Sequence, residues 1–98
     1  MNVQSAPEFN HWMLELNRKG RSQVNDRLDR IRERNHFGDK KYLDDSLFEL
    51  RWKSGRRVYY ALIEDDDGVA ALILLGGAKD GQDRDIAHAS KILEREAS

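Results

Sequence analysis

The sequence contains no cysteine, and this absence excludes disulfide bonds, thiolate catalysis and zinc sites built on thiolates. It also contains no apolar run long enough to span a membrane and no segment that resembles a signal peptide, so we expect no membrane span and a cytoplasmic location. With one proline and seven glycines, the chain has the composition of a folded protein. Its 98 residues predict a single domain, residues 1–98, with one modest core.

Neither sign of charge dominates, because 17 Lys and Arg residues nearly balance 18 Asp and Glu residues, for a net charge of -1. This balance argues against a nucleic-acid module of the usual basic kind. The charges are segregated, however: residues 18–34 and 51–57 are rich in Lys and Arg, whereas residues 64–67 are all acidic. A local positive field can attract an anion even when the total charge is close to zero.

Helical periodicity begins near the start of the chain. A capping box formed by Ser5 and Glu8, followed by an apolar stripe, predicts a first helix from Pro7 to Arg18, with Gly20 as its stop. A second amphipathic helix is expected over residues 22–37. The two helices should form a hairpin.

Alternating side chains predict a β-hairpin in the middle of the chain. Residues 47–53 alternate between apolar and polar types, and a second strand-like stretch covers residues 56–64. Ser54-Gly55 between them is a tight-turn signal, so the two stretches are expected to pair as antiparallel strands.

A long apolar run over residues 69–75 predicts a central strand that is buried on both faces. An acidic turn precedes this run, and Gly76-Gly77 is expected to end it. A polar loop then leads to a closing helix over residues 83–96. The predicted fold class is therefore α+β: a helical hairpin, a twisted antiparallel sheet of three or four strands, and a C-terminal helix.

The predicted hairpin carries four cations beside its turn: Arg51, Lys53, Arg56 and Arg57. Like charges on neighbouring strands ordinarily destabilise the pair, so an anion receptor would explain why Arg51 and Arg57 are both present. Lys79 follows the central strand and could reach the same edge of the sheet. Three cations around one hollow would bind a phosphate and stabilise the extra negative charge of a pentavalent phosphorus transition state.

A structural role for these cations stays open at this level. Lys53 and Arg56 would then form a solvated hairpin tip, and Arg51 would pair with Glu49 or with the acidic residues 44 and 45. The arginines of the second predicted helix likewise suit either an RNA-facing surface or a solvated face that its own carboxylates neutralise.

Other side chains could serve the same site. Tyr59 and Tyr60 face opposite sides of a strand, so one is expected in the core and the other near the sheet surface, where it could stack on a base. His88 could transfer protons or be an ordinary surface histidine. The histidines have no metal-ligand spacing, so no metal site is predicted. The candidate substrate-binding residues are Tyr60, Lys53, Arg56 and His88.

Three motifs occur in order along the chain: E-L-R at residues 49–51, R-V-Y-Y at 57–60 and G-G-x-K-x-x-Q-x-x-D-I at 76–86. With the sequence around them, over about residues 9–94, they resemble the phage-derived, HigB-like addiction-module killer proteins of the RelE/ParE toxin superfamily. The resemblance implies a toxin that cleaves mRNA, generally in the ribosomal A site, without a metal or cofactor. It also implies a cognate antitoxin, a HigA-like helix-turn-helix protein, through which alone the toxin would meet operator DNA.

The family mechanism implies that the ribose 2′-hydroxyl attacks the adjacent phosphate. By position, Arg57 and Lys79 would stabilise phosphate charge, Arg51 would orient the phosphate or ribose, and Gln82 and Asp85 would shape the loop and cap the helix. The nuclease that names the superfamily has a tyrosine in its last helix as general base, and this chain has none there, so the acid–base group stays open. The alternatives are a gyrase-inhibiting toxin of the ParE branch or an inactive toxin.

Overall fold

One five-stranded sheet organises the chain in the computed structural model, which describes residues 1–44 and 46–97. The sheet has the order β1-β5-β4-β3-β2, and neighbouring strands are antiparallel except for the parallel pair β1 and β5. The predicted α+β class is confirmed. In chain order the elements are β1 (Asn2–Ser5), α1 (Pro7–Glu15), α2 (Arg18–Arg34), β2 (Lys40–Tyr42), β3 (Leu47–Arg51), β4 (Arg56–Asp65), β5 (Gly68–Ala78), the 3₁₀ turn η1 (Lys79–Gly81) and α3 (Gln82–Ala97).

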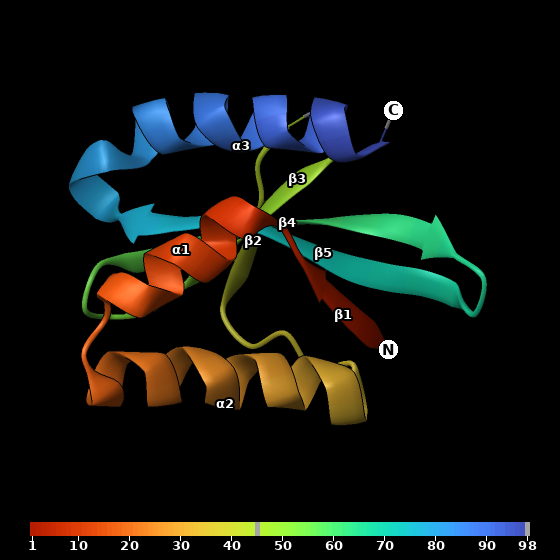
Figure 1. The fold of residues 1–98 in the computed structure, drawn as a ribbon. Helices are drawn as coiled ribbons and strands as arrows, with labels where there is room; N and C mark the ends of the chain where they lie inside the picture. The colour runs from red at the N-terminus through yellow and green to blue at the C-terminus, as the bar shows by residue number, and fades with distance from the viewer. Residues whose placement is uncertain (45, 98) are drawn as a thin grey trace.

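The sheet is the middle layer between helices (Figure 1). α2 lies on one side of it and α3 on the other, while α1 packs against β5. Along β3 and β4, side chains alternate between these two faces. One apolar core, with Tyr59 and Ile92, therefore lies beneath α3, and another, with Tyr60 and Ile31, lies beneath α2. None of the described helices is long and apolar enough to cross a membrane.

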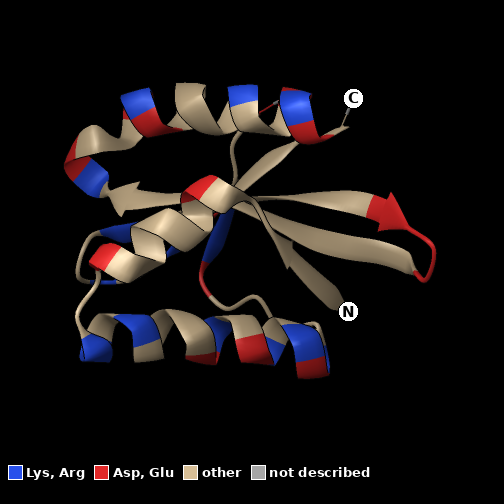
Figure 2. Cartoon of the chain, viewed as in Figure 1, with Lys and Arg blue, Asp and Glu red and all other residues tan. Residues whose placement is uncertain are grey.

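The predicted β3–β4 hairpin is present, although β3 ends at Arg51 rather than at residue 53. The Trp52 N–H donates to the Arg56 carbonyl at 3.1 Å, and the Gly55 N–H donates to the Trp52 carbonyl at 3.0 Å. Gly55 has a φ of 100°, a conformation that glycine adopts at little steric cost. The β4–β5 ribbon then carries its acidic turn beyond the helices, at the right of Figure 2.

The boundary between the first two helices differs from the prediction. α1 ends at Glu15, and α2 begins at Arg18 rather than near residue 22. The Asn17 side chain caps α2 by accepting a hydrogen bond from the Gly20 N–H at 2.8 Å. Gly20 is therefore a buried residue of the first helical turn and does not stop a helix.

The strand β1, which has four residues, was not predicted. β1 pairs in parallel with β5, with Asn2 opposite Ala70. Because Ser5 belongs to this strand, it does not cap α1; Ala6 occupies the cap position and forms no side-chain hydrogen bond. The predicted capping box is therefore wrong. β1 is largely exposed and too short to show a period of two in its sequence.

β5 continues past its predicted end. Gly76 and Gly77 remain paired with β4, and the strand ends at Ala78. A Cβ atom on Gly76 would overlap the Trp12 ring, and one on Gly77 would overlap the Asp85 carboxylate. These glycines therefore allow two side chains to approach the strand closely, one on each face of the sheet.

Candidate functional site

Arg51 and Arg57 are direct cross-strand partners, and Gly77 of β5 is the next residue in the same row. These three residues, the arginine row, lie on the face of the sheet that α3 covers. Lys79 follows Gly77 by two residues, and its N–H donates to the Gly55 carbonyl at 2.8 Å. The structure therefore brings the two arginines together and places Lys79 at the adjacent strand end.

Arg57 is buried, with 5% of its surface exposed. Its Nη1 donates to the Trp52 carbonyl at 3.2 Å and to the Arg56 carbonyl at 2.9 Å, whereas its Nε has no hydrogen-bond partner. Within the described part of the chain, no carboxylate forms an ion pair with it. Backbone carbonyls thus hold the guanidinium in place without neutralising its charge.

Glu49 is a buried carboxylate beside the arginine row, only 1% exposed. It accepts a hydrogen bond from Gln82 Nε2 at 2.8 Å, and Arg51 Nε lies 3.7 Å from its Oε1. Of the partners that the sequence left open for Arg51, the structure therefore shows Glu49; Asp45 lies outside the described residues. The Arg51 side chain remains 40% exposed, so part of it is still accessible to an anion.

Asp85 lies directly over Gly77, since a Cβ at that glycine would overlap its carboxylate. Burial raises the pKa of Asp85 above its ordinary value, while nearby Arg84 and His88 act in the opposite direction. The sequence reasoning assigned Asp85 to loop shape and helix capping and missed its place over the arginine row. The signal for it was Gly77, because a glycine inside a strand marks a close approach.

Tyr59 lies beneath α3 opposite Glu49 of β3 and is completely buried. Burial raises the pKa of its phenol, and the charges of Glu49 and Asp85 raise it further. Its hydroxyl has no hydrogen-bond partner among the described residues. Tyr59 therefore stays neutral and keeps an O–H donor beside the two carboxylates.

Tyr60 lies on the opposite face, in the core beneath α2, and is 1% exposed. Its ring stacks between Phe37 and Phe48, with centroid distances of 5.2 and 5.3 Å. Burial raises the pKa of Tyr60 to about 12. The predicted substrate-binding role is corrected, because the ring is buried in the core beneath α2 with Phe37 and Phe48 on its two sides, and a base cannot stack on it.

The other predicted substrate-binding residues lie in three separate places. Arg56 is on the α2 side, where its Nη1 donates to Gln23 Oε1 at 2.8 Å. Lys53 is exposed and lines a cleft of about 420 Å³ together with Arg51. His88 is exposed in a groove between α1 and α3. The structure does not gather these side chains into one site.

This architecture is shared with solved toxin structures. A chain of the intact RelBE toxin-antitoxin complex from E. coli matches with a TM-score of 0.64 and 18% identity, covering 79% of this chain and 94% of that one. A chain of the RelB-RelE antitoxin-toxin complex from Methanococcus jannaschii matches with a TM-score of 0.64 and 10% identity, covering 82% and 94%. The YoeB/ParE toxin from Agrobacterium tumefaciens matches with a TM-score of 0.63 and 10% identity, covering 80% of this chain and 98% of that one. The fold is that of the RelE-type toxins.

An uncharacterized protein of Haemophilus influenzae is 34% identical over 97 residues, which cover 98% of this chain and 95% of the relative. The chain belongs to the family of that protein. No family model matches the sequence. The resemblance to the RelE/ParE superfamily is thus confirmed in the fold, and the HigB-like subtype stays a prediction.

Proposed function

We propose that the protein is the toxin of a toxin–antitoxin pair and that it cleaves mRNA on the ribosome as a metal-independent endoribonuclease. The observation that carries the proposal is the arginine row with the Asp85 carboxylate over Gly77 and Lys79 just beyond it. Two arginines and a lysine provide charge for one phosphodiester, and the carboxylate provides a group for proton transfer. The fold shared with RelE-type toxins supports the same function.

The proposed reaction is a transesterification within the RNA chain. The ribose 2′-hydroxyl attacks the adjacent phosphorus and the bond to the 5′ oxygen breaks, which leaves a 2′,3′-cyclic phosphate and a 5′-hydroxyl end. Arg57 and Lys79 stabilise the charge on the phosphoryl oxygens, and Arg51 orients the phosphate or ribose. Asp85 accepts the proton of the 2′-hydroxyl, and the departing 5′ oxygen takes a proton from water.

We also propose that a cognate, HigA-like helix-turn-helix antitoxin holds the protein inactive in the cytoplasm and connects it to operator DNA. The support is that two chains of the same fold come from toxin-antitoxin complexes. In this scheme the toxin itself makes no base contacts with the operator.

Purified protein added to translating ribosomes tests the proposal. We expect cleavage of mRNA in the A site, in the presence of EDTA as well, with cyclic phosphate ends. Arg57→Ala and Lys79→Ala should each slow cleavage by about 100-fold while the circular dichroism spectrum is retained. Wild-type cleavage by both variants would reject the site. Intact mRNA with DNA-damage signalling in expressing cells would favour gyrase inhibition instead.

A further inference from the structure

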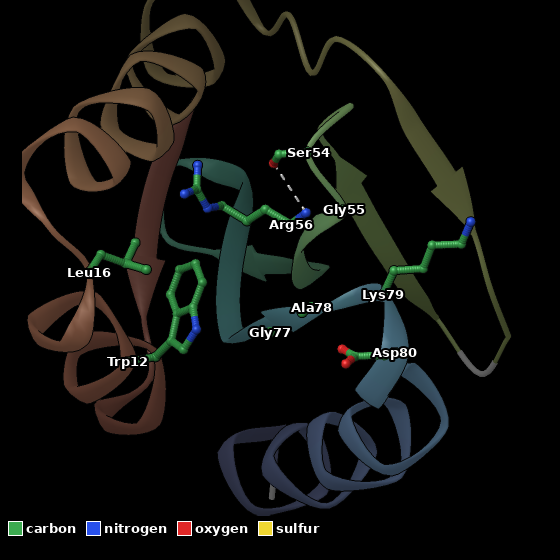
Figure 3. A pocket seen from close by; sticks show the side chains of 9 residues that line it. All are labelled: Trp12, Leu16, Ser54, Gly55, Arg56, Gly77, Ala78, Lys79 and Asp80. Carbon is green, nitrogen blue, oxygen red and sulfur yellow. Dashed lines mark hydrogen bonds between the residues drawn. The ribbon is translucent and has the colours of Figure 1, made fainter.

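A groove of about 820 Å³ opens at the end of the sheet, between α1 and the β3–β4 turn (Figure 3). A site of this size can hold a nucleotide-sized group. Trp12 and Leu16 form one wall, and the Arg56 side chain of β4 lies opposite them. This Trp12 groove is lined by Trp12, Leu16, Ser54, Gly55, Arg56, Gly77, Ala78, Lys79 and Asp80.

The Trp12 ring is fixed from two sides. It packs directly on the β5 backbone at Gly76, where any side chain would overlap it, and its centroid lies 5.8 Å from that of Phe9. The ring is only partly buried, and it lines this groove as well as the groove that contains His88. A flat aromatic surface that is already held in place loses little conformational entropy when a second ring stacks on it.

Arg56 extends from β4 across the groove toward α2 (Figure 3). Its Nη1 donates to Gln23 Oε1 at 2.8 Å, and its Nη2 lies 3.0 Å from where a Cβ on Gly20 would be. The guanidinium is thus held beside the first turn of α2, which a residue larger than glycine would crowd. A planar guanidinium both attracts phosphate and stacks on flat rings.

The Trp12 groove and the arginine row meet at Gly77, from opposite faces of the sheet. Gly77 lines the groove and is also the cross-strand partner of Arg57. Lys79 borders the groove, but its side chain points away from Trp12 (Figure 3). Ala78 between them is extended, so Lys79 lies on the same face of the sheet as Arg57. A phosphate bound by Lys79 and Arg57 would leave the neighbouring nucleotide at the mouth of the groove if the RNA passes around this end of the sheet.

We infer that the Trp12 groove binds one base of single-stranded RNA next to the cleaved phosphate, stacked on Trp12 and held beside Arg56. The inference rests on the proposed ribonuclease function and adds the position of a flanking nucleotide. Charge complementarity favours RNA over an apolar protein anchor, because Arg56 and Lys79 flank the groove and Asp80 is the one carboxylate among its described lining residues. Stacking is tolerant of base identity, so the groove adds affinity without a sequence code.

The test uses a fluorescein-labelled hexauridylate with 2′-O-methyl groups, which cannot be cleaved, and a set of the same hexamers with one abasic position each. Fluorescence anisotropy gives the affinities. The hexamer that lacks the base at the Trp12 groove should bind wild-type protein about tenfold more weakly than the intact hexamer. Trp12→Leu should weaken binding of the intact hexamer by a similar factor and should abolish the abasic penalty, because both changes remove the same contact.

Two further variants complete the test. Trp52→Leu, a partly buried tryptophan in a different cleft, is the matched control and should leave the abasic penalty unchanged. Arg56→Lys keeps the charge, loses the planar surface and does not disturb the packing of Trp12 on β5, so it should reduce the abasic penalty even if Trp12→Leu proves unstable.

Two results would overturn the inference: an abasic penalty that persists in Trp12→Leu and Arg56→Lys, or wild-type protein that binds no hexamer. Either result leaves the proposed function standing if ribosomal cleavage still depends on Arg57 and Lys79. Loss of antitoxin binding without loss of hexamer binding in Trp12→Leu would assign the groove to a protein partner and would equally reject the RNA assignment.

Discussion

Glu49 and Gln82 are joined by a hydrogen bond of 2.8 Å that connects β3 to the first residue of α3. Because Arg51 lies 3.7 Å from the same carboxylate, one buried group both orients a cation of the site and anchors the helix that carries Asp85. A buried carboxylate is costly to desolvate unless hydrogen bonds and charge compensate it. The pair therefore couples the stability of the fold to the geometry of the proposed site.

Replacing Glu49 separates these two contributions. Glu49→Ala leaves the Gln82 amide and Arg51 without their partner, and we expect it to lower the free energy of unfolding by about 2 kcal/mol in urea titrations. Glu49→Gln keeps an acceptor for Gln82 and should cost less, while still slowing cleavage because Arg51 loses its counter-charge. Glu64→Ala, an exposed carboxylate on β4, is the control and should be neutral. Equal stability of Glu49→Ala and wild type would contradict this account.

The two glycines at the end of β5 should respond differently to substitution. Gly77→Ala forces the Asp85 carboxylate away from the arginine row, so we expect cleavage to fall by about tenfold or more. Gly76→Ala instead collides with the Trp12 ring and should lower the free energy of unfolding by about 1–3 kcal/mol. Cleavage kinetics and urea unfolding of both variants distinguish the effects. Unchanged cleavage by Gly77→Ala would show that the position of Asp85 is unimportant.

The pH dependence of cleavage should report Asp85. Only the ionised Asp85 can accept the 2′-hydroxyl proton, and burial raises the pKa of Asp85 above its ordinary value. The cleavage rate should therefore fall as the pH drops through this raised pKa. Asp85→Asn should slow cleavage by about 100-fold and remove this limb of the profile. A carboxyl whose pKa is higher in the folded than in the unfolded state destabilises the fold once it is ionised. Asp85→Asn removes this charge, so the variant should melt at a slightly higher temperature than the wild type at neutral pH.

Asp83→Asn provides the matched control for Asp85, since Asp83 is an exposed carboxylate in the same helical turn. It should keep both the rate and its pH profile. If Asp85→Asn retained the acidic limb, another group would have to accept the proton.

The ion pair between Glu8 and Arg95 should stabilise the fold above mildly acidic pH. Arg95 donates to both carboxylate oxygens of Glu8, at 2.6 and 2.9 Å, and these hydrogen bonds lower the pKa of Glu8 from 4.5 to about 2. A lowered pKa of an acid means that its stabilisation is full above the unfolded-state value and is lost as the pH falls from about 4.5 through 2. The pair connects α1 with the end of α3.

Thermal melts of wild type and Glu8→Gln at several pH values measure this contribution. The wild type should melt a few degrees higher at pH 7, and the difference should vanish near pH 2. Since Arg95 is half exposed, added salt should also reduce it. Glu64→Gln, at an exposed carboxylate of β4 that forms no ion pair within the described part of the chain, is the control and should melt close to the wild type at each pH. A difference that stays constant down to pH 2 would contradict the assignment.

Local signals predicted much of the fold. The β3–β4 hairpin followed from a period of two and the Ser54-Gly55 turn signal, but the register that places Arg51 directly opposite Arg57 depends on a longer loop, in which Trp52 pairs with Arg56. The placement of Asp85 over Gly77 depends on how α3 crosses the sheet, and no local sequence pattern predicts that crossing. β1 was missed for a similar reason: its pairing partner is the distant strand β5, and pairing between distant segments leaves no signal in four residues.

The position of the acidic β4–β5 turn has a consequence for how the molecule meets a polyanion. β4 runs from Arg57 of the arginine row to Asp65 at this turn, and at about 3.3 Å per residue the two lie roughly 26 Å apart. The positive charge of the arginine row at one end and the negative charge of the turn at the other give the nearly neutral protein a dipole moment (Figure 2). In the field of a negatively charged assembly, the molecule would rotate so that its arginine row faces the assembly. The encounter would then be oriented, while the net charge near zero would keep nonspecific binding weak.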